Sequence, residues 1–269
     1  MKSAAIAAAT ALFCTAAALP AQARTLCTMV ADAADGRVLV KDGDCDTPVT
    51  PASTFKIALA VMGFESGLLK NAHDPLLPFR PGYTDWAGAV WREPTDPQRW
   101  LKYSVVWYSQ LLARELGTAR LTDYARSFDY GNADFSGDAG KDNGLERAWI
   151  GSSLKIAPAG QIAFLEKLVN LRLPVKREAM EKTIAIVETA ATAPGGWQVR
   201  GKTGMAYPRN ADGSFDEAHA WGWYVGWAQK DGRTLVFARL DQDTEKQDTP
   251  TGNRARAAFL EAFPATIAD

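Results

Sequence analysis

The 269-residue sequence predicts an α+β fold, in which an antiparallel sheet lobe is flanked by N- and C-terminal helices and carries an inserted all-helical lobe. Strand-like runs occur near both ends of the chain, and apolar residues recur at helical spacing through its middle. We expect a single domain, with the sheet lobe over about 24–52 and 195–269 and the helical lobe over about 53–194. A cleft between two such lobes is a natural place for a binding site.

The first 23 residues have the layout of a secretory signal peptide. Met1 and Lys2 precede an Ala-rich apolar run, and residues 21–23 form an A-x-A cleavage site. A membrane anchor is the alternative, but the segment is short and ends in small residues. We therefore expect cleavage before Arg24, a periplasmic protein and no membrane anchor after cleavage.

Two cysteines, Cys27 and Cys45, follow the signal segment and are expected to form a disulfide in an oxidising compartment. They flank strand-like runs at 26–31 and 37–41. A three-residue hairpin loop centred on Gly36 would place residue 27 opposite residue 45. The alternative is a pair of buried, unpaired thiols.

The run from Ile57 to Phe64 is apolar on every side and predicts a helix buried within the protein. Residues 71–102 are rich in Pro, Asp and Trp, which favours loops and short turns. Further helices are expected around 121–128, 162–169 and 180–187. Strands are expected over 197–206, 220–229 and 234–240, followed by a closing helix over 253–263.

Composition excludes several classes of function. A net charge of −1 offers nothing to attract nucleic acid. His73 and His219 are the only histidines, which is too few for a zinc hydrolase site with several N or S ligands, and no metal is expected. The sequence also lacks a G-x-S-x-G elbow, so a serine enzyme built on this chain would not use histidine as its base.

Ser53-Thr54-Phe55-Lys56 matches the S-x-x-K pattern at the start of the buried helix. Ser53 and Lys56 are one helical turn apart and share a face, so they can pair a nucleophile with an amine. Ser152 and Lys155 match the same pattern, but Pro158 follows and disfavours a continuing helix there. The alternative for Ser53 is a plain helix N-cap.

Two other motifs could complete a site. Lys202, Thr203 and Gly204 lie on a predicted strand, where a cation and a hydroxyl could hold a carboxylate and glycine permits close approach. An ordinary exposed Lys-Thr pair is the alternative. Ser104 opens a Ser-Val-Val triplet that ends at Val106, and it could bring a third polar group from the helical lobe, although it could equally be a loop serine.

In their order along the chain, these motifs resemble those of the class D β-lactamases, or oxacillinases. The resemblance includes the turn at 130–132, Trp149 ahead of the second S-x-x-K match, and the strand at 222–227. A class A enzyme would show S-D-N where this chain has Ser-Val-Val. Taken singly, Trp149 could be a core residue and 130–132 an ordinary turn.

The resemblance implies that Ser53 is the nucleophile and that Lys56, carboxylated by carbon dioxide, is its general base. Only a neutral amine reacts with carbon dioxide, and burial beside Phe55 would lower the pKa of Lys56 enough to provide one. The Trp149 indole N–H would donate to the carbamate. Backbone N–H groups of Ser53 and Met205 would form the oxyanion hole.

The resemblance also implies a small-molecule β-lactam substrate, with Ser104 relaying a proton to the leaving nitrogen. It places the substrate against Val106, Lys202, Thr203, Gly204 and Arg254, with Arg256 as the alternative to Arg254. A penicillin-binding transpeptidase or a β-lactam sensor is the nearest rival, because both acylate without fast release. A carbohydrate- or peptidoglycan-binding module is a rival of another class. Monomer and homodimer both stay open.

Overall fold

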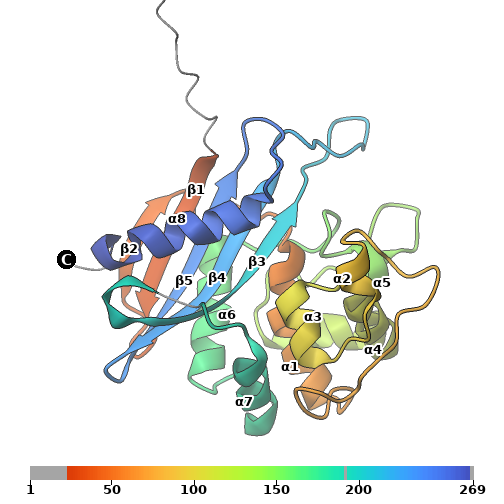
Figure 1. The fold of residues 1–269 in the computed structure, drawn as a ribbon, viewed down its shortest axis with the longest axis horizontal. Helices are drawn as coiled ribbons and strands as arrows, with labels where there is room; N and C mark the ends of the chain where they lie inside the picture. The colour runs from red at the N-terminus through yellow and green to blue at the C-terminus, as the bar shows by residue number, and fades with distance from the viewer. Residues whose placement is uncertain (1–22, 191–192, 267–269) are drawn as a thin grey trace, which may run out of the picture.

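The computed structural model describes residues 23–190 and 193–266, so the expected signal peptide lies almost wholly outside the described residues. The ribbon has two parts, a sheet with helices against its faces and a group of helices beside one sheet edge (Figure 1). No helix in the described ranges is long and apolar enough to cross a membrane.

A five-stranded antiparallel sheet of order β2-β1-β5-β4-β3 confirms the expected sheet lobe. Its strands are β1 (Arg24–Asp32), β2 (Val38–Gly43), β3 (Gln198–Ala206), β4 (Trp221–Lys230) and β5 (Arg233–Gln242). Both ends of the chain thus contribute to one sheet. Most of β4 is buried continuously rather than alternately, because helices cover both faces of the sheet.

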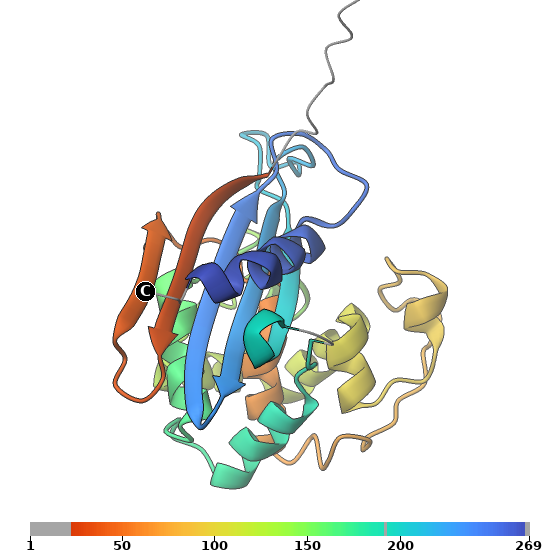
Figure 2. The ribbon, with the colours of Figure 1, turned by 60° about the vertical axis from the view of Figure 1, so that its left-hand side comes forward.

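Helix α8 (Thr251–Thr266) covers one face of the sheet and α6 (Pro158–Val169) covers the other (Figure 2). Phe259 of α8 stacks on Phe237 of β5, with ring centroids 4.2 Å apart. Helices therefore flank the sheet as expected, with α8 as the C-terminal one and α6 on the opposite face. Residues ahead of β1 that could form an N-terminal helix lie outside the described residues. Although its residues fall within the segment expected to form the helical lobe, α6 packs on the sheet.

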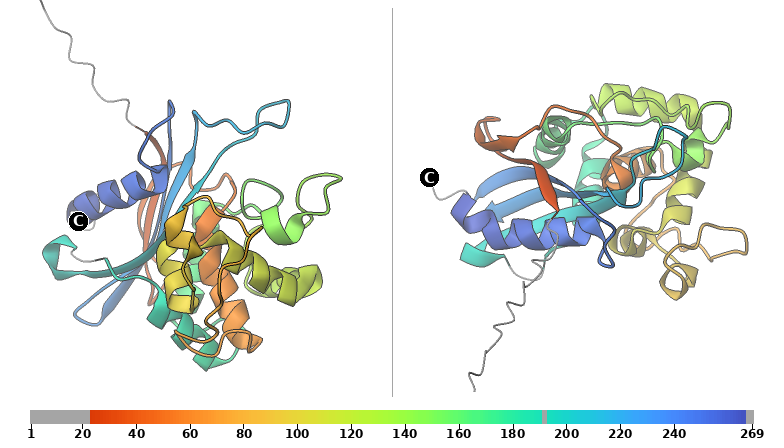
Figure 3. Two further views of the ribbon diagram at one scale, coloured as in Figure 1. Left: turned by 45° about the vertical axis from the view of Figure 1, so that its right-hand side comes forward. Right: turned by 90° about the horizontal axis from the view of Figure 1, so that it is seen from above.

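The remaining helices stand beside β3 or below it (Figure 3). They are η1 (Ala52–Thr54), α1 (Phe55–Glu65), α2 (Ala89–Arg92), α3 (Pro97–Tyr103), α4 (Val106–Ser127), α5 (Gly144–Arg147), α7 (Arg177–Ile186) and η2 (Pro194–Gly196). As expected, α1 is buried on all sides. Residues 71–102 are not only loops, because α3 begins there with Asp96 as its N-cap and proline at its first position. Helix α4 also begins well before residue 121.

The disulfide joins Cys27 to Cys45 with their Cα atoms 5.1 Å apart, as expected, but the hairpin register differs from the expected one. Cys27 pairs with Gly43, because Ala31 pairs with Val38 and the hairpin loop is therefore centred between residues 34 and 35 instead of on Gly36. A bulge between Val30 and Ala31 then shifts the register by one residue. Cys45 therefore lies just beyond the end of β2, where the turn brings it back to β1.

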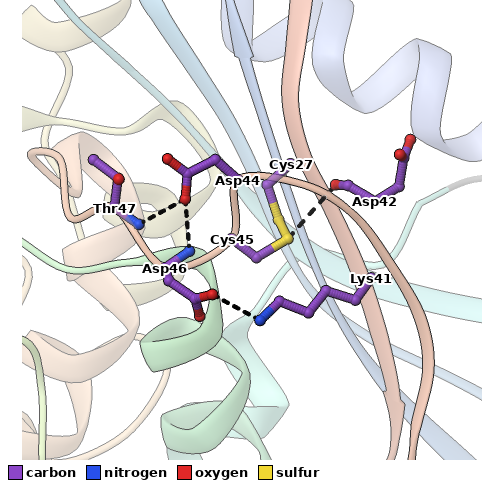
Figure 4. The surroundings of a disulfide bond; sticks show 7 residues. All are labelled: Cys27, Lys41, Asp42, Asp44, Cys45, Asp46 and Thr47. Carbon is purple, nitrogen blue, oxygen red and sulfur yellow. Dashed lines mark hydrogen bonds and ion pairs between the residues drawn. A yellow bond between two sulfur atoms is a disulfide. The ribbon is translucent and has the colours of Figure 1, made fainter.

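The turn after β2 is held by its own acidic residues (Figure 4). The Asp44 carboxylate accepts hydrogen bonds from the backbone N–H groups of Asp46 and Thr47, at 3.1 Å and 3.0 Å. Lys41 pairs with Asp46 at 2.7 Å. These contacts keep Cys45 in reach of its partner at the sheet edge far from β3.

Candidate active site

A cavity of about 430 Å³ lies between β3 and the helical lobe, and it contains most of the residues that the sequence singled out. Ser53 comes from η1, Ser104 from the junction of α3 and α4, and residues 202–205 from β3. The start of α8 adds Gly252 and Asn253. Segments far apart in the sequence thus meet around one opening.

Ser53 lies in η1, directly after a residue with strained backbone. Ala52 has a φ of 51°, a left-handed value that is unusual for a non-glycine residue and is often found beside functional groups. Strand β3 approaches this turn so closely that a Cβ on Gly204 would lie 3.1 Å from the Pro51 carbonyl oxygen. Glycine at 204 therefore permits the contact that brings β3 next to the serine.

Lys56 is fully buried, and its Nζ lies 3.1 Å from the Ser53 Oγ. In the described parts of the chain no carboxylate pairs with this amine, and Phe55 and Ile57 on either side of it are buried too. Burial, with a smaller contribution from the charge of Lys202, holds the pKa of Lys56 well below its ordinary value. The structure therefore places a buried lysine amine against a serine hydroxyl, in surroundings that favour the neutral form of the amine.

Trp149 is fully buried, and its Nε1 has no hydrogen-bond partner within residues 23–190 and 193–266. Its ring lies 5.4 Å from that of Phe55, which neighbours Lys56. By contrast, the buried indoles of Trp107 and Trp223 each donate to a backbone carbonyl. An unpaired buried donor is expensive, so an acceptor at this position would stabilise the site.

The backbone that carries Trp149 is fixed to the segment before Ser53. The Thr50 hydroxyl donates to the Trp149 carbonyl oxygen at 2.9 Å and accepts from the Gly151 N–H at 3.0 Å. Thr50 is buried, which makes these bonds strong constraints. The indole is therefore held in place by contacts that do not use its own N–H.

Lys202 forms the sheet side of the cavity and is only 5% exposed. Burial lowers the pKa of Lys202 to about 8, with Glu188 acting in the opposite direction and Arg256 adding to the decrease. Ser104 faces the same cavity with a left-handed φ of 59°. Thr203, Met205 and Val106 line it as well.

The two candidate arginines lie close to the cavity but do not line it. Arg254 is engaged by the buried carboxylate of Asp243, and its Nε donates to the Thr249 carbonyl oxygen at 3.2 Å. Arg256 lies 3.6 Å from the Glu188 carboxylate, and its charge acts on Lys202. Of the two guanidinium groups, that of Arg254 is the more firmly committed to a carboxylate of the protein.

The second S-x-x-K match does not form a helical pair. The Ser152 Oγ donates to the Asp138 carboxylate at 2.7 Å, outside the main cavity. Lys155 lies in extended backbone before α6, where its N–H donates to Asn132. The structure thus brings Ser53, and not Ser152, next to a buried lysine.

Among the residues of the cavity wall that sequence reasoning did not single out are Trp86, Lys102, Tyr103 and Ile150. Adjacency to Ser104 and Trp149 could have indicated the last three. Trp86 had no such signal, because it lies in a loop without periodicity. Within the described residues no group of three or more His, Cys, Asp or Glu side chains could hold a metal ion.

The two-lobed fold, with a serine and a buried lysine one helical turn apart facing a Lys-Thr-Gly strand, defines a serine acyl-transfer protein of the penicillin-binding class. The family model for the penicillin binding protein transpeptidase domain matches residues 26–264. The sequence is 42% identical to the β-lactamase OXA-9 of Klebsiella pneumoniae over 88% of this chain and 86% of the relative. It is 38% identical to OXA-1 of Escherichia coli over 72% and 66%. The chain belongs to the class D β-lactamases, a family of hydrolases.

The fold agrees with that assignment. The crystal structure of the class D β-lactamase OXA-427 superposes with a TM-score of 0.83 at 42% identity, covering 90% of this chain and 98% of that one. The resemblance inferred from the ordered motifs is therefore confirmed at the level of the family and the fold.

Proposed function

We propose that this protein hydrolyses the β-lactam ring of penicillin-type antibiotics through an acyl-enzyme on Ser53 and so gives antibiotic resistance. The observation that carries the proposal is the buried Lys56 amine 3.1 Å from the Ser53 hydroxyl, facing a cavity with a second buried lysine. The relatives OXA-9 and OXA-1 are named as β-lactamases, which supports the same substrate class.

In the first step the Ser53 hydroxyl gives its proton to the base at Lys56, and its Oγ attacks the lactam carbonyl carbon, so that the ring C–N bond breaks and an ester on Ser53 forms. In the second step a water molecule, deprotonated at Lys56, hydrolyses that ester and regenerates the Ser53 hydroxyl. The backbone N–H groups of Ser53 and Met205 stabilise the oxyanion that develops, which is the largest single contribution to be expected from such a site. Ser104 passes a proton toward the leaving nitrogen. Lys202 and Thr203 hold the substrate carboxylate at the sheet side of the cavity.

A carbon dioxide adduct of Lys56 fits these residues. Burial lowers the pKa of the Lys56 amine, which favours the neutral form that carbon dioxide requires, and the unpaired Trp149 N–H provides a donor for an anionic oxygen. When bound, carbon dioxide would turn the amine into a carbamate, an oxygen base suited to serine and water. The chain contributes a dry pocket around Lys56 and a fixed donor in Trp149.

The second cation at the carboxylate end is Arg254 or Arg256. Arg254 comes directly after two residues of the cavity wall, whereas Arg256 acts electrostatically on Lys202. We propose Arg254, which Asp243 holds in place, with Arg256 as the alternative, and each guanidinium keeps N–H groups beyond its own carboxylate partner. Replacing the arginine that holds the substrate carboxylate with Ala should raise KM, so a comparison of Arg254→Ala with Arg256→Ala decides between them.

We also propose secretion to the periplasm through a signal peptide at 1–23, with residues 24–269 acting as one domain. The A-x-A site ahead of Arg24 supports cleavage, and the disulfide supports an oxidising compartment. Amino-terminal sequencing of the secreted protein should begin at Arg24.

The nucleophile is tested with matched serine variants. Ser53→Ala should abolish the acyl adduct formed with benzylpenicillin, whereas Ser152→Ala should keep it, because Ser152 lies outside the cavity and bonds Asp138. Intact-protein mass spectrometry gives the readout. An adduct on the Ser53→Ala protein would falsify the assignment.

Turnover separates a hydrolase from a transpeptidase or sensor. Many cycles per molecule are expected with a chromogenic cephalosporin, whereas the rivals would stop after one. Lys56→Ala should lose turnover and retain any adduct that does form, because the variant lacks the base for release. Turnover near that of the parent would show that another group is the base.

The Trp149 donor is tested with bicarbonate. Mild acid should lower activity because it protonates the Lys56 amine, and bicarbonate should restore part of it. Trp149→Ala should increase the dependence on bicarbonate about tenfold, the effect of losing one hydrogen bond to a buried anion. Rates in degassed buffer with and without bicarbonate decide the matter. If neither protein responds, the carbamate is ruled out even when hydrolysis occurs.

A further inference from the structure

The helical-lobe wall of the cavity carries a cation that the mechanism above does not use. Lys102 lines the cavity together with Trp86 and Tyr103, on the opposite side from Lys202 of β3. None of the residues that line this cavity is acidic. The wall is therefore positive and aromatic, and nothing on it offsets the charge.

Lys102 has no ion pair or hydrogen bond to a carboxylate in the described parts of the chain. The Lys102 Nζ lies 5.3 Å from the centroid of the Tyr103 ring. The Arg99 guanidinium lies 4.4 Å from the same centroid, so two cations share one ring. An ammonium in this position is free to pair with an anion that enters the cavity.

Trp86 gives this wall an apolar platform. Its side chain is 60% exposed, which is unusual for a large aromatic residue. The ring is supported by Trp91 at 6.2 Å and by the Arg147 guanidinium at 5.7 Å. Trp91 in turn donates to the Tyr103 carbonyl oxygen at 2.9 Å, which connects the platform to the chain next to Ser104.

We propose that Lys102, with Trp86 and Tyr103, forms a specificity subsite for a β-lactam acyl side chain that carries its own anion. This inference rests on the proposed function, since it assigns Lys202 to the carboxylate of the ring system. A substrate whose ring carboxylate is held by Lys202 has its acyl side chain facing the wall formed by the helical lobe. A second carboxylate on the side chain then meets Lys102, while an aromatic group on the same side chain packs against Trp86.

The effect is modest because Lys102 is exposed. Exposed ion pairs change an equilibrium by about two- to fivefold, and salt screens them. Such a factor is measurable when the substrates differ in one small substituent whose charge is zero, negative or positive, and when each variant is compared across the same set. Benzylpenicillin, its α-carboxy derivative and its α-amino derivative form that set.

The experiment measures kcat/KM for the three penicillins in the parent, in Lys102→Gln and in Lys102→Glu. Lys102→Gln should lower the value for the α-carboxy compound about two- to fivefold relative to benzylpenicillin, and raise it for the α-amino compound. Lys102→Glu should enlarge both changes, and 0.5 M salt should reduce them. The matched control is Lys141→Gln, an exposed lysine outside the cavity that removes the same charge.

Equal changes for all three substrates would overturn the subsite, and so would a charge preference that Lys141→Gln removes equally. Second-order rates of acylation give the same comparison if turnover is slow, because they require only attack by Ser53. A parent protein that is never acylated would overturn the proposed function itself, and the subsite with it. An intact charge preference in Lys102→Gln would leave the hydrolase in place and reject Lys102 alone.

Discussion

At the scale of single residues, the site is defined by two buried lysines whose pKa values are lowered to different extents. Lys56 has a hydroxyl beside it and no carboxylate, so burial lowers the pKa of its amine well below the ordinary value. Lys202 is nearly as buried, but the charge of Glu188 partly opposes the loss of its proton. The two amines therefore suit different tasks, one as the precursor of a base and the other as a cation for a carboxylate.

The pKa of Lys202 near 8 predicts how activity depends on pH. Below that value Lys202 is charged and attracts a carboxylate, and above it the attraction is lost. The parent kcat/KM for benzylpenicillin should therefore fall as pH rises through about 8. In Lys202→Arg the guanidinium stays charged, so the fall should move to higher pH. Identical alkaline limbs in both proteins would assign the titration to another group.

At the scale of elements, the position of α8 against β3 depends on Gly252. A Cβ on Gly252 would lie 2.4 Å from the Gly204 carbonyl oxygen, which is backbone and cannot move alone. Gly252 and Gly204 both line the cavity. The first turn of α8 can therefore shape the carboxylate end of the site only while position 252 lacks a side chain.

Gly252→Ala should push α8 away from β3 and distort the cavity. We expect a loss of about 1–3 kcal/mol in the free energy of unfolding, from overpacking, together with a raised KM. Gly160→Ala on α6 is the matched control, because its Cβ would meet only the Ile156 side chain. Denaturant unfolding and steady-state kinetics give the two readouts. If Gly252→Ala matches the control in both unfolding free energy and KM, then α8 and β3 accommodate the added methyl group at little cost.

At the scale of the whole molecule, the stabilising cross-link and the chemistry lie at opposite edges of the sheet. The disulfide joins β1 to the turn after β2, while the cavity lies beside β3. Strands β5 and β4 separate β1 from β3. Changes at the first edge should therefore affect stability without affecting catalysis.

Replacing both Cys27 and Cys45 with Ser should lower the free energy of unfolding by about 3 kcal/mol, the value expected for a closed loop of this length. The kcat and KM at 25 °C should stay close to those of the parent. Thermal melts and kinetics of the double variant test this, and the reduced parent protein is the control. A large fall in kcat of the folded double variant would show that the two edges are coupled.

The sequence was sufficient for those features that depend on neighbours along the chain. The Ser53–Lys56 spacing, the Lys-Thr-Gly strand and the alternation of strands and helices are local, and they predicted the fold and the family. Start signals for α3 were also present, but the Pro- and Asp-rich segment around them indicated loops. The hairpin register was predicted wrongly because the loop is centred between residues 34 and 35 and not on Gly36, and a bulge changes the register once more.

Only the tertiary structure decided which distant groups face the cavity. Thr50 and Trp149 are 99 residues apart in sequence, yet their hydrogen bond positions the unpaired indole. Trp86 and Lys102 join Ser53 in one cavity through packing of the helical lobe. Periodicity sets the face on which a residue lies within its own helix or strand, whereas the partner across a cleft depends on how all the elements pack together.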